Sequence, residues 1–266
     1  MKKVNEKVIE QWNKISDSDW YMNERTDKVI QGIISNPETA FHRTTWEVIK
    51  SSFPDIRGKK ICVPSSGDSH AVFAFAALDA KVTSCDISER QLEHASQIAE
   101  KNNLDIDFIL QNTMDLPDIK TSEYDFVYTS EGVHVWIDDL KSMYKNIYRV
   151  LKSGGAYINY EIHPFSRPFK DELGKINILK SYESTGPFDN GIEYHWRMQD
   201  LINAIASSGL TIKRLEEMHD EKDKGHFWFY QDKRATMTQE DIDGYYNWKV
   251  NPLAALPQWF TVLAIK

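Results

Sequence analysis

The chain has 266 residues, of which 41% are hydrophobic and 27% are charged, and its formal net charge at pH 7 is −8. Such a length and composition are typical of one large α/β domain with additional segments. The negative charge disfavours a general basic surface for nucleic acid. The first residues lead into no uninterrupted apolar run, and no stretch approaches the about 20 apolar residues that span a bilayer. We therefore expect a cytoplasmic protein with no membrane segment.

The two cysteines, Cys62 and Cys85, lie in apolar runs that have the character of strands. This setting predicts buried free thiols and no disulfide framework. No pair of histidines is spaced as metal ligands beside a third donor, so we expect no metal site.

Residues 1–52 are predicted to form a helical N-terminal cap. Apolar residues recur at helical spacing from Val4 to Ile15, and two further helices are expected at about 24–34 and 38–50.

Residues 53–161 are predicted to form a cofactor-binding core of alternating strands and helices. Its last helix, over about 140–151, is expected to stop at Gly154 and Gly155. Because right-handed crossovers place helices on both faces, this alternation predicts a doubly wound, parallel sheet. The strands are expected at about 60–63, 81–86, 106–110, 124–129 and 156–161, and the other helices at about 71–78 and from Ser88.

The alternation breaks after residue 161. Residues 162–196 are rich in proline and glycine and are predicted to be an acceptor-side insertion. Residues 197–266 are predicted to complete a seven-stranded sheet, interrupted by an aromatic insertion at 219–258. An insertion this long in a compact domain is usually functional. Residues 1–266 are expected to form a single domain.

Two features at the carboxyl ends of predicted strands indicate a ligand site, because ligands of doubly wound sheets bind there. The first strand is followed by a turn of small residues, Pro64 to Ser69, which lets the backbone approach a ligand closely. Asp86 ends the second strand, where a carboxylate can accept hydrogen bonds from both hydroxyls of a ribose. Together they predict an adenosine-containing cofactor. A tight turn plus a helix-capping aspartate is the alternative.

These strings resemble the class I S-adenosylmethionine-dependent methyltransferases. The family's first motif, an acid followed by three spaced glycines, falls on Ile61 to Ser69, where only Gly67 is kept. Gln111 to Pro117 resembles the family's Leu-Pro segment, and Tyr124 to His134 its fourth strand and following turn. Arg149 to Gly155 resembles the stop before strand five. The match covers about 58–161 by motif and 197–266 by pattern.

The resemblance implies a Rossmann-like, mostly parallel sheet whose last strand, Thr261 to Ile265, is antiparallel. It also implies S-adenosyl-L-methionine as the cofactor, with Asp86 on the ribose, Ile87 beside the adenine, and Asn112 in place of the acid that binds the adenine amino group. The residues expected to bind the cofactor are Ser65, Ser66, Gly67, Asp68, Asp86, Ile87, Asn112, Thr113, Met114, Ser130 and Glu131.

Methyl transfer from a sulfonium mainly requires positioning and exclusion of water, with a base only if the acceptor must lose a proton. His134, after the fourth strand, and His163, after the fifth, are the candidate catalytic bases, and a structural role is the alternative for each. Glu131 could contact the cofactor or the acceptor. His195 and Arg197 could reach an acceptor, with helix capping and surface pairing as the alternative.

An aromatic run, Phe227 to Tyr230, could roof an apolar acceptor together with Trp20, Tyr21 and Trp46, although such residues are often core. The sequence thus predicts a methyltransferase acting on a small molecule. The alternatives are an inactive cofactor-binding protein of the same fold, a methyltransferase acting on a macromolecule and, more distantly, a nicotinamide-dependent oxidoreductase. The acceptor and the oligomeric state stay open.

Overall fold

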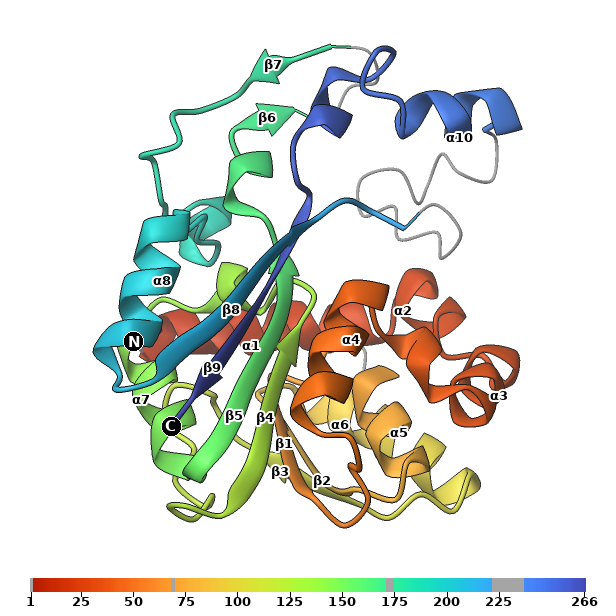
Figure 1. Cartoon of the computed structure of the whole chain (residues 1–266), viewed down its shortest axis with the longest axis vertical. Coiled ribbons are helices and arrows are strands. Elements are labelled where there is room, and N and C mark those ends of the chain that lie inside the picture. Colours follow the sequence, from red (N-terminus) through yellow and green to blue (C-terminus); the bar gives the residue numbers. More distant parts are fainter. Residues whose placement is uncertain (1, 68–69, 171–174, 222–236) are drawn as a thin grey trace.

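The computed structural model describes residues 2–67, 70–170, 175–221 and 237–266, with side chains from residue 6 onward. Its main sheet has seven strands in the order β3-β2-β1-β4-β5-β9-β8 (Figure 1). Strands β1 to β5 pair in parallel, and β9 is antiparallel to both β5 and β8. The predicted fold class is therefore confirmed. The strands are β1 (Lys60–Pro64), β2 (Lys81–Asp86), β3 (Ile106–Leu110), β4 (Tyr124–Ser130), β5 (Leu151–Ile162), β8 (Thr211–Met218) and β9 (Trp259–Ile265).

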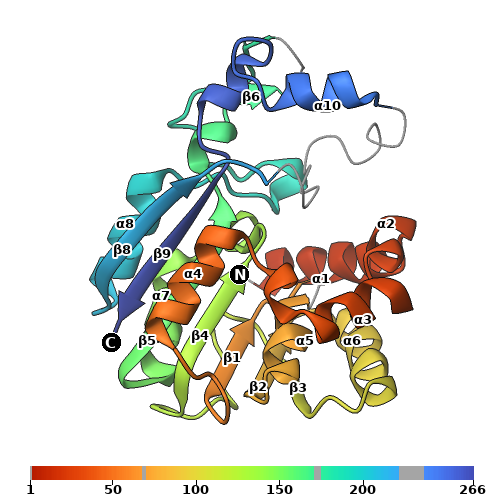
Figure 2. The ribbon, with the colours of Figure 1, turned by 45° about the vertical axis from the view of Figure 1, so that its right-hand side comes forward.

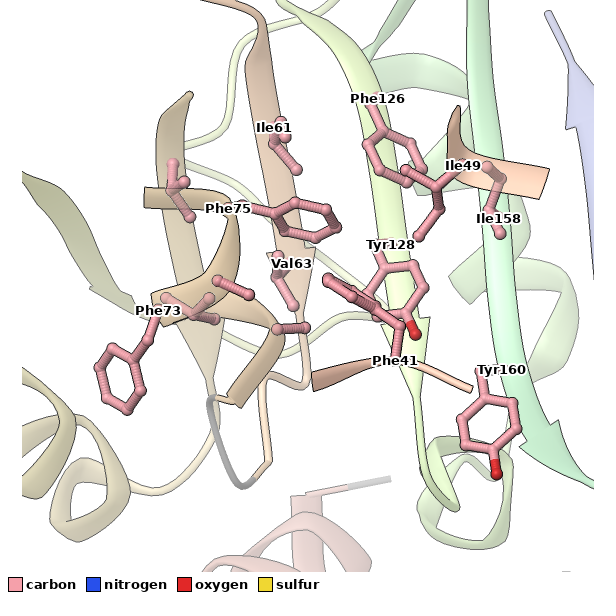
Figure 3. Close-up of a cluster of buried hydrophobic side chains, with 14 of the residues drawn as sticks. Phe41, Ile49, Ile61, Val63, Phe73, Phe75, Phe126, Tyr128, Ile158 and Tyr160 are labelled. Carbon is pink, nitrogen blue, oxygen red and sulfur yellow. The ribbon is translucent and has the colours of Figure 1, made fainter. Parts of the chain in front are cut away.

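Two layers of helices bury the two faces of this sheet. In β1, Ile61 and Val63 join the aromatic core cluster beneath α3 to α6, whereas Cys62 joins the cluster beneath α7 and α8. This alternation is the two-residue period of a strand. Figure 3 shows the first cluster, in which the Phe75 ring packs edge to face against both Phe126 and Tyr128. The helices are α3 (Asp27–Ser35), α4 (Arg43–Ser52), α5 (His70–Ala77), α6 (Glu89–Lys101), α7 (Leu140–Val150) and α8 (Met198–Ser207).

The N-terminal cap contains more breaks than the sequence predicted. Helix α1 (Lys2–Ser16) is present as expected, the helix predicted at 24–34 is α3, which begins three residues later, and the short helix α2 (Asp19–Asn23) before it was not predicted. Ser18 caps α2 by accepting a hydrogen bond from the Tyr21 amide, and extended Thr26 begins α3. The helix predicted at 38–50 starts as a 3-10 turn, η1 (Pro37–Ala40), and α4 begins only after the capping residue His42.

The paired glycines do not end α7, which corrects the predicted helix stop. The helix ends at Val150, and Leu151 already pairs with Tyr124 of β4. Gly154, at φ +76°, lies in β5 where the register with β4 shifts. Gly155 is required there because a Cβ would lie 2.9 Å from the carbonyl oxygen of Lys152.

A second group of short elements lies beyond the carboxyl end of β5 (Figures 1 and 2). We call its described residues, 163–170, 175–196 and 237–258, the cap lobe. Within the part of the chain that the structure describes, no helix is long and apolar enough to cross a membrane. The elements of the lobe are η3 (Pro164–Ser166), β6 (Phe169–Lys170), β7 (Asn177–Ile178), η4 (Asp189–Gly191), α10 (Gln239–Tyr245) and η5 (Pro252–Ala255).

Candidate active site

A cavity opens at the carboxyl ends of β1, β2 and β4, where doubly wound sheets bind ligands. Every residue expected to bind the cofactor lines this cavity, except Asp68, which lies outside the described residues. The cavity is lined by Val8, Trp12, Ile15, Trp20, Tyr21, Ser65, Ser66, Gly67, Asp86, Ile87, Asn112, Thr113, Met114, Ser130, Glu131, Gly132, Val133, Trp136 and Ile137.

The turn after β1 has a left-handed backbone at both Ser65 and Gly67, with φ of +53° and +55°. Two bonds hold the serine in this unfavourable conformation. The Ser65 hydroxyl lies 2.6 Å from that of Thr113, and the Ser66 amide donates to the carbonyl of Cys85 at 3.1 Å. A serine can therefore take the conformation that usually requires glycine, at a cost of about 1–2 kcal/mol. The Ser66 hydroxyl is buried and has no partner among the described residues.

Asp86 presents a buried carboxylate to the cavity. It accepts hydrogen bonds from the amides of Ser88 at 2.9 Å and Gly67 at 3.3 Å. Burial raises its pKa to about 6, although these backbone hydrogen bonds lower it. The N-cap of α6 is Ser88, whose hydroxyl accepts from the Gln91 amide, so the expected alternative of a capping aspartate does not hold.

The loop after β3, from Gln111 to Pro117, is held by one of its own side chains and by side chains of α7. The Asn112 side-chain oxygen accepts from the Met114 amide at 2.9 Å, and the second lone pair of this oxygen is available for a further donor. The Met114 carbonyl accepts from Asn146 of α7 at 2.8 Å. Arg149, which the sequence placed in a structural motif, also donates to the carbonyl of Leu116 at 2.7 Å.

Helices α1 and α2 form the far wall of the cavity. Trp20 and Tyr21 of α2 were expected near the acceptor, but no contribution of α1 was predicted. Val8, Trp12 and Ile15 line the cavity from α1, and the Trp12 ring meets that of Trp136 edge to face at 5.4 Å. Asn13 anchors α1 by accepting from the Ser88 hydroxyl at 2.6 Å. The apolar face of α1 was visible in the sequence, but periodicity alone does not say what such a face covers.

Arg25 lies buried behind Tyr21, one of the residues that line the cavity. Its guanidinium carbon is 3.3 Å from the centre of the Tyr21 ring, and Nη1 donates to the Tyr21 carbonyl at 2.6 Å. Among the described residues, Nε and Nη2 have no hydrogen-bond partner. A buried guanidinium with two unpaired nitrogens fits an anionic ligand. No motif in the sequence marked this arginine.

The turn after β4 also has left-handed residues, Glu131 at φ +62° and Gly132 at φ +94°. The Glu131 amide donates to the carbonyl of Tyr160 on β5 at 2.8 Å, which fixes the turn against the sheet. Gly132 adopts this conformation without strain, but for Glu131 it is strained, and strain of this kind concentrates at functional sites. Ser130, Glu131 and Gly132 line the cavity as a result.

His134 lies in η2 (Val133–Trp136) but does not line the cavity. Its Nδ1 is 2.9 Å from a Glu161 oxygen that also accepts from its backbone amide, and its Nε2 is 2.6 Å from the Tyr144 hydroxyl. Burial acts to raise the pKa of Glu161, but the charge and hydrogen bonds of His134 outweigh it and leave that pKa lowered. These contacts tie η2 to β5 and hold the His134 ring outside the cavity lining.

His163 is likewise buried and outside the cavity. Its Nδ1 accepts from the Phe165 amide at 3.2 Å, so the proton is on Nε2, which lies 2.8 Å from Glu217. Burial lowers the pKa of His163, with Glu217 opposing. Its ring therefore caps η3, and the structure does not bring it to the cofactor side.

The other acceptor-side candidates are also placed away from the cavity. Arg197, the N-cap residue of α8, donates to Asp200 through Nε and Nη2, each at 2.8 Å, and Asp200 also accepts from the Arg197 backbone amide at 3.0 Å. His195 packs against Phe188 with ring centres 4.8 Å apart. Trp46 stacks on Phe41 in the core, whereas Trp20 and Tyr21 line the cavity. The aromatic run at 227–230 lies outside the described residues.

Comparison with known proteins agrees with this architecture. A family model described as a methyltransferase domain matches residues 65–155. The chain is 28% identical over 203 residues to YbaJ of Bacillus subtilis (strain 168), described as an uncharacterized methyltransferase, and the match covers 75% of this chain and 78% of that protein. It is 28% identical over 156 residues to a sterol 24-C-methyltransferase, erg6, of Aspergillus fumigatus, a match that covers 57% of this chain but only 39% of that enzyme.

Among solved structures, an S-adenosylmethionine-dependent methyltransferase from Mesorhizobium loti superimposes with a TM-score of 0.61. Its sequence is 18% identical, and the match covers 83% of this chain and 97% of that one. At 18% identity, this similarity indicates a shared fold and carries no conclusion about activity.

Proposed function

Because the chain belongs to the class I S-adenosylmethionine-dependent methyltransferases, we propose that the cavity beside β1, β2 and β4 holds S-adenosyl-L-methionine while a small molecule receives the methyl group. The observation that carries this proposal is the pairing of a left-handed turn at Ser65 to Gly67 with the carboxylate of Asp86. A turn of this kind lets the backbone approach the cofactor, and the carboxylate is suited to two hydroxyl donors.

The polar groups of the cavity match the parts of the cofactor. Asp86 would accept from the ribose hydroxyls, and the adenine would lie between Ile87 and the loop at Asn112 to Met114. The buried Ser66 hydroxyl would bind the carboxylate of the methionine part, and the positive charge of Arg25, behind Tyr21, would attract that carboxylate. The bound cofactor supplies an activated methyl group on a sulfonium, and the residues of the chain orient it and exclude water.

The proposed acceptor is a small molecule because helices enclose the cofactor cavity. Trp12, Tyr21 and Trp136 wall it with aromatic rings, an arrangement that leaves little room for a protein or nucleic-acid chain. The similarity to a protein named as a sterol 24-C-methyltransferase also supports a methyl acceptor of small-molecule size. Neither His134 nor His163 lines the cavity, so the proposal uses neither as a base.

Titration calorimetry of the intact chain with S-adenosylmethionine and S-adenosylhomocysteine tests the proposal. We expect micromolar binding of both, and a large loss in Asp86→Ala. The matched control is Asp107→Ala, an exposed aspartate on the edge strand β3 that does not line the cavity. If wild-type protein binds neither ligand at millimolar concentration, the cofactor assignment is wrong.

A further inference from the structure

Helix α1 crosses the cofactor cavity at the carboxyl-end side of the sheet and is attached at its two ends (Figures 1 and 2). Near the start of the helix, the Lys7 ammonium donates to the carbonyl of Asn190 in the cap lobe at 2.8 Å. Near its end, the Asn13 side chain accepts from the hydroxyl of Ser88, the N-cap of α6, at 2.6 Å. Between these attachments, the helix lines the cavity with Val8, Trp12 and Ile15.

The attachment at the end of α1 also includes Asp17, the residue that follows the helix. Its carboxylate accepts from Nε of Arg90 at 2.8 Å and lies 3.0 Å from Nε2 of His94, and both partners belong to α6. The side chains of Arg90 and Asp17 are 43% and 52% exposed. Because ion pairs between exposed side chains contribute little to stability, these polar contacts hold α1 only weakly.

The apolar face of α1 is not part of a hydrophobic core. Of the side chains that the structure describes, none in α1 belongs to the two core clusters that pack against the sheet. Trp12 and Ile15 are only half-buried, although both line the cavity. A ligand that fills the cavity would lie against these side chains and complete their burial, so it would stabilise the docked position of α1.

Ser88 links the docked helix to the ribose side of the cavity. Its amide donates to the Asp86 carboxylate at 2.9 Å, and its hydroxyl donates to Asn13 of α1. One residue therefore fixes both the carboxylate that is proposed to bind the ribose and the end of the helix. Coupling between two such events is reciprocal, so a ligand that binds better under a docked α1 favours docking to the same extent.

The chain after α1 offers a hinge at Asp17 and Ser18. Ser18 has an extended backbone, with φ −75° and ψ 152°, and begins α2. Helix α2 itself is fixed, because the Tyr21 side chain is fully buried and the Arg25 guanidinium lies over its ring. Hinges are commonly a few residues at the end of an element, so α1 can move while α2 keeps its place.

A second cavity, of about 280 Å³, lies where the cap lobe meets the end of β8 and gives a contrast. Among the described residues, the two cavities share no lining residue, and none of those that line the second belongs to α1. Its wall includes Tyr245, Trp248 and Asn251. Residues 245–256 are therefore a comparison segment that a cofactor in the first cavity does not contact.

We infer that α1 is a strap that opens in the free protein and closes over the bound cofactor, held closed by Asn13 and Asp17, an inference that rests on the proposed function. Closure keeps water away from the activated methyl group, and the cofactor product leaves only after the strap has opened. Asn13 and Asp17 are positioning residues, since they act through α1 and do not line the cavity.

Hydrogen exchange of the intact chain, followed by mass spectrometry with and without saturating S-adenosylhomocysteine, tests the movement. We expect the amides of α1 to exchange about tenfold more slowly in the complex, because the ligand binds only the closed form tightly. Residues 245–256 should exchange equally in both states. If the ligand binds but the exchange of α1 does not change, the inference is wrong and the proposed function stands. If S-adenosylhomocysteine does not bind, the proposed function fails instead.

Release of radiolabelled S-adenosylhomocysteine into an excess of the unlabelled compound tests the two positioning residues. Asn13→Ala and Asp17→Ala should each speed release about threefold, and the double variant about tenfold, with association rates within about twofold of wild type. Asp55→Ala is the matched control, because Asp55 forms the same kind of exposed pair with Arg57 and does not line the cavity. It should release the ligand at the wild-type rate. Wild-type release from the double variant, or a loss of affinity that lies in association alone, would overturn the inference.

Discussion

The cofactor cavity and the cavity of the cap lobe are built by different means. In the first, ligand groups are backbone turns and strand ends, such as Ser65 to Gly67 and Asp86, whose positions follow from the parallel sheet. In the second, side chains on short irregular elements, such as Asn251 and His219, supply the polar groups. The first kind of site is fixed by topology and shared across a fold, whereas the second is set by individual residues and can differ from one protein to the next.

The largest expected effect is at Asp86. Replacing it with alanine removes the acceptor for two ribose hydroxyls, and charge-assisted bonds of this kind contribute about 1.5–3 kcal/mol each. Calorimetry should show S-adenosylhomocysteine binding weakened by about 100-fold or more. Asp107→Ala should keep wild-type affinity. A loss below threefold in Asp86→Ala would mean that the topological site does not hold the ribose.

Arg25 tests whether the cap also contributes to the first cavity. Arg25→Met should weaken S-adenosylhomocysteine binding about tenfold, because the positive charge behind Tyr21 no longer attracts the carboxylate. Methylthioadenosine lacks that carboxylate, so its affinity should stay unchanged in the same variant. Equal losses for both ligands would indicate a folding defect around Tyr21 instead of an attraction for the carboxylate.

The pH dependence of binding sharpens the role of Asp86 further. Its pKa is raised to about 6 by burial, whereas ribose hydroxyls donate to the ionised form and would lower the pKa in the complex. Binding therefore requires loss of the proton, and affinity should fall about tenfold as pH is lowered from 7.5 to 5. Asp86→Asn should bind weakly and show a nearly flat profile over the same range. If the affinity of Asp86→Asn falls with pH as steeply as that of the wild-type protein, a group other than Asp86 causes the pH dependence.

Two tryptophans give the smallest effects and the most direct contrast between the cavities. Trp12→Ala should weaken cofactor binding severalfold, because the ring lines the first cavity and packs on Trp136. Trp248→Ala, in the wall of the second cavity, should leave cofactor affinity within twofold. Fluorescence titration with S-adenosylhomocysteine measures both. Similar losses in the two variants would mean that the cavities are not independent.

The features that follow from the order and direction of the strands were predictable from the sequence. The strands, the antiparallel β9 and the cluster around Asp86 follow from hydrophobic runs and from the rule that parallel strands bring their carboxyl ends to one edge. The break before Thr26 and the position of Gly154 inside β5 were not predictable, because local capping and a register shift decided them.

The parts that depend on side-chain partners could not be predicted. His134 and His163 follow the correct strands, but Glu161 and Glu217, remote in sequence, bind their rings outside the cavity. The apolar face of α1 lines the cavity, and Arg25 lies behind Tyr21, only through the packing of the N-terminal cap. Sequence patterns report periodicity and spacing, and they do not report which distant partner a side chain finds.

Ser65 takes the left-handed conformation at a position where the methyltransferases that this chain resembles have a glycine. Its hydroxyl reaches Thr113 at 2.6 Å, a bond that glycine could not make, and so joins the turn after β1 to the loop beside the expected adenine. A serine can replace the first glycine of such a turn when a threonine after the strand two places away can hydrogen-bond to it. We expect either change made alone to destabilise the turn. We therefore expect the two positions to vary together among homologues. A serine at position 65 should occur with a threonine at position 113, whereas a glycine at position 65 should allow other residues at position 113.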